Sequence, residues 1–198
     1  MRGQNVTNNP RFLMERPKYW ICICALVFLI QPVPAAERQE VWEPLVFLMG
    51  NWEAVAKPGS AKGGFTFSFD LQNKIMVRRN HAEYPAANGR PASTHDDLMI
   101  IYHEGAPSAL HAIYFDAEDH VIHYAVQTGP GAKVTFVSEV LVNMPRYRLS
   151  YDRLPDGMLH GKFEIAPPGK PEAFEKYLEW EARRSSKGGE PAPLRKVR

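Results

Sequence analysis

Hydrophobic and polar residues alternate with a period of two through most of the chain, which is the pattern of half-buried β-strands. The segment GGFTFSFD places its three phenylalanines on one face and Thr66 and Ser68 on the other. The segment KVTFVSEV repeats the alternation, with Val134 and Phe136 opposite Thr135. The pattern predicts about ten strands, at Asn51–Lys57, Gly63–Asp70, Lys74–Tyr84, Asp96–Glu104, Leu110–Asp116, His120–Thr128, Lys133–Val140, Arg146–Asp152, Leu159–Ala166 and Glu175–Arg184.

The connections between these segments are short and rich in Gly, Pro, Asn and Asp, so successive strands are expected to be antiparallel neighbours. Two longer connections, Pro85–Thr94 and Pro167–Phe174, are candidate loops at the mouth of the fold. A short helical turn is predicted in EVWEPLVFLM, before the first strand. An open meander of this size would leave two exposed edges, and closure removes them. The sequence therefore predicts an all-β fold, an up-and-down antiparallel barrel of about ten strands.

The chain ends differ in composition from the predicted barrel. Tyr19–Ile30 is an apolar run preceded by basic residues and followed by QPVPAAE, as in a signal peptide. We therefore expect residues 1–36 to be a signal peptide, with translation starting at Met1 or Met14, and the protein to be periplasmic or secreted. Residues 37–184 would form the barrel domain, and residues 185–198 a flexible basic tail. Both cysteines, Cys22 and Cys24, lie in the apolar run, so the mature chain would hold no disulfide.

Composition excludes several function classes. The net charge of +2, without a basic stripe, does not favour nucleic acid as a partner. The mature chain has no nucleophilic cysteine, no Gly-x-Ser-x-Gly elbow and no glycine-rich phosphate loop between a strand and a helix. We therefore assign no catalytic residues from sequence. No membrane span is expected in the mature chain, and the oligomeric state is left open.

The strand VRRNHAEYPA is unusually rich in charged and titratable groups. If Lys74 faces solvent, the odd-numbered residues from Ile75 to Glu83 face inward, while Arg78 and Asn80 point out. Such a strand would run from an apolar floor to a polar, ligand-lined mouth. The alternative is a structural salt-bridge network at a strand end. The predicted ligand-binding residues are Arg79, His81, Glu83, His123 and Tyr147.

Histidines cluster in the middle of the chain and raise the question of a metal. His120 and His123 lie on opposite faces of one strand and cannot share an ion. His95 and Asp97 share a face, and His81 could approach from the neighbouring strand. A metal site assembled across strands in this way is weak evidence. We therefore interpret these histidines as mouth or surface residues and expect no metal.

The stretch PLVFLMGNW, with Gly50 and Trp52 in a Gly-x-Trp motif, resembles the start of a calycin barrel. In that superfamily an arginine of the last strand commonly packs across the tryptophan. Arg184 matches it here, because it shares the apolar face of its strand with Trp180 and Ala182. The chain lacks the disulfide and the later motif of secreted lipocalins. It is more similar to lipocalin-like bacterial families and to nitrobindin-like ten-stranded barrels.

The resemblance implies a ligand-binding barrel rather than a particular ligand. Nitrobindins bind haem through a histidine near the C-terminus, and no histidine follows His160 here, so no cofactor is expected. The leading hypothesis is an exported, noncatalytic protein that holds a small amphipathic or anionic molecule in the barrel. One alternative is an acid-base enzyme with His81 or His123 as base and Arg79 or Tyr147 stabilising an oxyanion. The other is a structural or interaction barrel with a filled interior.

Overall fold

The computed structural model describes residues 41–56, 60–87, 89–104 and 109–185. The predicted signal peptide and, apart from Ser185, the predicted tail lie outside these ranges. In the described ranges, no helix has the length and apolar character needed to cross a membrane.

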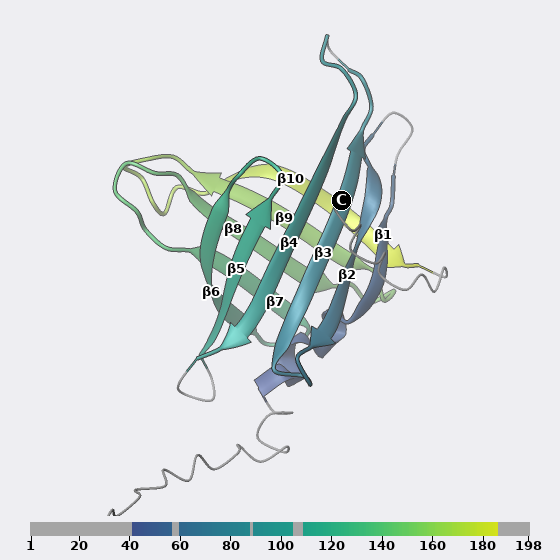
Figure 1. The fold of residues 1–198 in the computed structure, drawn as a ribbon, viewed down its shortest axis with the longest axis vertical. Helices are drawn as coiled ribbons and strands as arrows, with labels where there is room; N and C mark the ends of the chain where they lie inside the picture. The colour runs from purple at the N-terminus through teal and green to yellow at the C-terminus, as the bar shows by residue number, and fades with distance from the viewer. Residues whose placement is uncertain (1–40, 57–59, 88, 105–108, 186–198) are drawn as a thin grey trace, which may run out of the picture. The chain divides into compact units, whose positions relative to one another are not determined.

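Ten antiparallel strands form one closed barrel, so the all-β barrel predicted from the alternation is confirmed (Figure 1). Each strand pairs with its neighbours in the sequence, and the first strand pairs with the last. A short 3-10 turn, η1 (Glu43–Leu48), precedes the first strand as predicted. The strands are β1 (Gly50–Ala54), β2 (Lys62–Asp70), β3 (Ile75–Tyr84), β4 (Ser93–His103), β5 (Leu110–Asp116), β6 (Val121–Gly129), β7 (Lys133–Ser138), β8 (Arg146–Arg153), β9 (Leu159–Ala166) and β10 (Glu175–Arg184).

Aromatic side chains fill the centre of the barrel. Tyr151 of β8 is fully buried, and its ring contacts four other aromatic rings with centroids 5.7–6.4 Å away. One of these is Trp180 of β10, which lies over Gly161 of β9. A Cβ atom on Gly161 would come within 2.3 Å of the Trp180 ring, so only glycine leaves room for the indole. The remaining rings around Tyr151 belong to Phe65, Phe67 and Phe136.

The segment around η1 covers one end of the barrel, near the β2–β3 turn (Figure 1). Trp42 packs edge-on against Phe69 at 5.6 Å between ring centroids. Its indole Nε1 donates a hydrogen bond to the carbonyl oxygen of Asn73 at 3.1 Å. Leu45 and Leu48 of η1 are fully buried in the same core. We call this the closed end, and the other end, where the β3–β4 and β9–β10 loops lie, the open end.

The join between β1 and β10 contains the predicted tryptophan–arginine contact. The Arg184 guanidinium lies over the Trp52 ring at 4.6 Å from the centroid. The indole Nε1 of Trp52 donates to the Leu48 carbonyl, and Arg184 Nη1 donates to the Met49 carbonyl, both at 2.7 Å. Gly50 has a φ of +112°, and a Cβ there would lie 2.5 Å from Arg184 Nη1. Gly50 of the Gly-x-Trp motif therefore leaves the space that the Arg184 guanidinium occupies.

We predict that Trp52→Ala lowers the free energy of unfolding by about 3–5 kcal/mol, because it removes a buried aromatic side chain. Arg184→Ala should cost about 0.5–2 kcal/mol, the range of a cation–π contact, and shift the tryptophan emission. Chemical denaturation followed by fluorescence measures both effects. Arg183→Ala is the matched control, since Arg183 is exposed and pairs with the exposed Glu53 at 3.6 Å. Equal effects of the two arginine variants would contradict the account.

Candidate functional site

The side chains of β3 point in the opposite directions to those that we predicted from sequence. Arg78 is 5% exposed and faces the interior, while Arg79, His81 and Glu83 are exposed on the outer face. The prediction took its phase from Lys74, which lies in the turn before the strand and does not share its alternation. The inward placement of these three residues is therefore wrong, and so is the outward placement of Arg78.

The three residues do lie together, on the outside of the barrel. They line a shallow, open hollow over β1–β5. His81 Nδ1 lies 2.7 Å from Asp96 Oδ1, and His81 Nε2 lies 3.5 Å from Glu83 Oε1. The hydrogen bond to Asp96 raises the pKa of His81. This arrangement fits the salt-bridge network that the sequence left open as the alternative.

The other two predicted ligand-binding residues divide between the faces. His123 of β6 is exposed on the outer face. Tyr147 of β8 faces inward as its alternation required, with its ring stacked on Phe163 at 6.0 Å and an interplanar angle of 7°. Burial raises the pKa of the Tyr147 hydroxyl. Tyr147 is thus the one predicted ligand-binding residue with a place inside the barrel.

A buried ion pair takes the interior position that we had predicted for Arg79. The Arg78 guanidinium pairs with the Asp97 carboxylate of β4, and the two side chains are 6% and 4% exposed. Asn80 donates a hydrogen bond from Nδ2 to Asp97 Oδ2 at 2.9 Å. Burial opposes the charge on Arg78, but the Asp97 carboxylate outweighs it and raises the pKa of the guanidinium. Within the described part of the chain, Arg78 Nε and the Tyr151 hydroxyl are buried without a hydrogen-bond partner.

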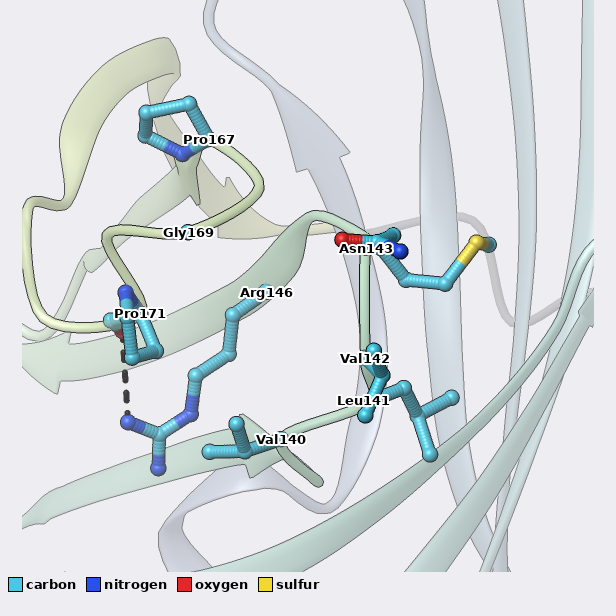
Figure 2. A pocket seen from close by; sticks show the side chains of 9 residues that line it. Val140, Leu141, Val142, Asn143, Arg146, Pro167, Gly169 and Pro171 are labelled. Atoms are coloured by element: carbon cyan, nitrogen blue, oxygen red, sulfur yellow. Dashed lines mark hydrogen bonds between the residues drawn. The ribbon is translucent and has the colours of Figure 1, made fainter.

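A separate pocket of about 230 Å³ lies at the open end, between the β7–β8 and β9–β10 loops. Figure 2 shows Val140, Leu141 and Val142 on one side and the β9–β10 loop on the other, with the Arg146 side chain between them. The apolar side is unusually exposed, with 89% of Val142 and 61% of Val140 accessible to solvent. Pro167–Phe174, predicted as a mouth loop, thus forms one wall of the pocket.

Arg146 is the one charged side chain among the described residues that line this pocket. Its Nε donates to the Ser138 carbonyl at 3.0 Å, and its Nη1 donates to the Pro171 carbonyl at 3.3 Å. Nη1 also pairs with Glu172, whose side chain is 81% exposed. The Arg146 side chain is itself 18% exposed. A partly buried cation with a solvent-exposed partner is therefore held at the wall of an apolar pocket.

The β9–β10 loop is fixed against the outside of the barrel by a second arginine. The Arg148 guanidinium lies over the Phe174 ring at 4.1 Å from its centroid. Arg148 also donates two hydrogen bonds to Glu164, at 2.7 and 2.9 Å. The bond from Arg148 lowers the pKa of the Glu164 carboxyl. The loop is thus held both by Arg146, which lines the pocket, and by Arg148, which does not.

Sequence reasoning missed both the pocket and the buried pair. The signal for the pocket was present: the apolar run Val140–Val142 interrupts a turn, where polar residues are expected. The pairing of this turn with the β9–β10 loop is a long-range contact with no local pattern. The buried pair gave little signal, because Asp97 stands beside His95 and Asp96 in the polar half of its strand.

We predict that Arg78→Leu lowers the free energy of unfolding by about 3–5 kcal/mol, because it leaves Asp97 buried without its partner. The neighbouring Arg79→Leu, on the exposed face, should stay within about 0.5 kcal/mol of the parent. Urea denaturation of the two variants provides the comparison. A similar loss of unfolding free energy in both variants, or a larger loss in Arg79→Leu, would contradict the inward placement of Arg78.

Comparisons with known proteins assign no family to the chain. No protein-family model matches the chain, and no curated protein gives a significant sequence match.

Proposed function

We propose that the protein is an exported, noncatalytic binding protein that holds a small amphipathic molecule with an anionic head group at the open end of its barrel. The observation that carries the proposal is Arg146, a cation at the wall of an apolar pocket whose carboxylate partner is exposed. Export is proposed from the signal-peptide pattern of residues 1–36, with a periplasmic or extracellular location.

The head group of such a ligand would replace Glu172 as the partner of Arg146. The Arg146–Glu172 pair is exposed on the glutamate side, and exposed pairs contribute only about 0–1 kcal/mol. Displacing Glu172 therefore costs little, whereas a carboxylate in the pocket would meet a guanidinium already positioned by the carbonyls of Ser138 and Pro171.

The apolar body of the ligand would cover the exposed side of the pocket. Val140 and Val142 expose apolar surface to solvent. Each Å² of it that the ligand covers stabilises the complex by about 25 cal/mol. The pocket of about 230 Å³ is smaller than the roughly 300–1,000 Å³ typical of sites that enclose a drug-sized ligand. It suits a ring or a short alkyl segment, with the rest of the molecule lying over the loops.

The two alternative functions receive different support. Tyr151 and the rings around it fill the middle of the barrel, which favours a structural or interaction barrel over one that holds its ligand deep inside. The acid-base enzyme is less favoured, because His81 and His123, its two candidate bases, lie on the outer face. The open-end pocket keeps small-molecule binding as the first proposal.

The test is calorimetric titration with decanoate, and with decyl glucoside as an uncharged probe of the same chain length. Arg146→Met should weaken decanoate binding about tenfold or more, the loss of one charge-assisted hydrogen bond, and change decyl glucoside binding little. Val142→Ser should weaken both probes about three- to tenfold, since it removes apolar contact.

The matched control is Leu71→Ser, which removes an apolar side chain that is 62% exposed in the β2–β3 turn, at the closed end. It should leave both titrations unchanged. An absence of saturable binding by the parent, or an equal loss in Leu71→Ser and Val142→Ser, would leave the structural barrel as the better reading.

A further inference from the structure

We propose that the open end also carries a binding site for Zn²⁺ or a chemically similar divalent metal ion. Its ligands are His95, Asp116 and Glu118. His95 lies near the start of β4, Asp116 ends β5, and Glu118 lies in the turn that follows. One ligand atom from each side chain lies within 4.8 Å of the other two. This site is separate from the pocket around Arg146, and it does not depend on the ligand proposed there.

The distances between the three ligand atoms are close to those around a bound metal ion. Zn²⁺ binds nitrogen and oxygen at about 2.0–2.2 Å, so ligand atoms around a tetrahedral ion lie about 3.3–3.6 Å apart. A shift of about 1 Å closes the difference. Glu118 can supply it, because its side chain is 48% exposed and belongs to a turn.

The imidazole of His95 is oriented by a buried carboxylate outside the ligand set. Nε2 lies 3.3 Å from Asp97 Oδ2 and 3.2 Å from the Tyr114 hydroxyl, while Nδ1 lies 3.0 Å from Glu118 Oε2. Asp97 is itself held by Arg78 and Asn80. Metal-binding histidines typically donate their second ring N–H to such a carboxylate, which leaves the other nitrogen free for the ion. Asp97 is therefore a positioning residue that directs Nδ1 toward the site.

Asp116 is held in place by contacts to both of its carboxylate oxygens. Its side chain is 6% exposed, and Oδ1 accepts hydrogen bonds from the backbone N–H groups of Glu118 and His120 at 3.0 and 2.9 Å. Oδ2 lies 2.8 Å from His120 Nδ1. These contacts hold the carboxylate of Asp116 next to His95 and Glu118.

A second histidine–carboxylate cluster, around His81, lacks these features. At His81 the two ring nitrogens face Asp96 and Glu83, one on each side of the ring. Both carboxylates are 64% exposed, so no buried group orients the imidazole. His81 therefore has the geometry of surface ion pairs, and it provides a control inside the same molecule.

The donor set indicates the class of ion. One imidazole nitrogen and two carboxylates suit Zn²⁺ and its first-row neighbours, whereas Mg²⁺ and Ca²⁺ prefer oxygen alone. Three protein ligands leave a coordination position for water or a small ligand. The proposal departs from the expectation of no metal from sequence, which had weighed His95 with Asp97 and His81. The structure places Asp97 behind the ring and His81 on the outer face.

The test is calorimetric titration of chelator-treated protein with ZnCl₂ in a non-coordinating buffer. We expect saturable binding of one equivalent, weakened at least tenfold by Glu118→Gln, which keeps the size of an exposed side chain. Asp97→Asn should weaken it about 10–100-fold, the usual effect of losing an outer carboxylate. Because Asp97 is buried, its variant is compared by circular dichroism with the parent before titration.

His81→Gln and Asp96→Asn are the matched controls and should bind Zn²⁺ as the parent does. Zn²⁺ should also raise the melting temperature of the parent and of the controls more than that of Glu118→Gln. No saturable binding at millimolar Zn²⁺, unchanged affinity in Glu118→Gln, or an equal loss in His81→Gln would each overturn the proposal.

Discussion

The ion pair between Arg78 and Asp97 constrains the rest of the barrel. Two charges that are 6% and 4% exposed are stable in an apolar interior only as partners, so β3 and β4 must present them to each other. This fixes the phase of both strands. On the same faces Met76 and Met99 point into the core on one side of the pair, and Asn80 and His95 lie toward the open end on the other.

The pair also marks a boundary inside the barrel. On the closed-end side, Tyr151 is fully buried among its aromatic neighbours, and the Trp52–Arg184 contact completes the join of β1 and β10. On the open-end side lie the loop pocket with Arg146 and the histidine–carboxylate cluster around His95. Because side chains fill the middle of the barrel, binding sites are expected at the loops and strand ends. Both proposed sites lie there.

Sequence reasoning predicted the fold because alternation and turn residues are local signals. It also predicted the contact of Arg184 with Trp52, since face-sharing along β10 selects Arg184 over Arg183. It failed on β3 because that strand carries apolar and charged residues on both faces: Val77 is 5% exposed although it points outward, and arginines stand at both 78 and 79. A period of two cannot choose a phase when both phases look alike.

The candidate sites were harder to predict because they join distant segments. The pocket brings residues near 140 together with residues near 170, and the proposed metal ligands come from β4 and the turn after β5. Neither set has a spacing motif. Only the register of the closed barrel, together with the burial of Asp97, places these side chains next to one another.

The most direct measurement of the central constraint is proton exchange at the arginine side chains, followed by NMR at the Nε–H groups of the unmodified protein. Burial of Arg78 against Asp97 predicts that its Nε–H exchanges with water far more slowly than that of Arg79, which is exposed on the next residue of the same strand. Equal exchange rates at the two positions, or slower exchange at Arg79, would contradict the buried pair and the strand phase that depends on it.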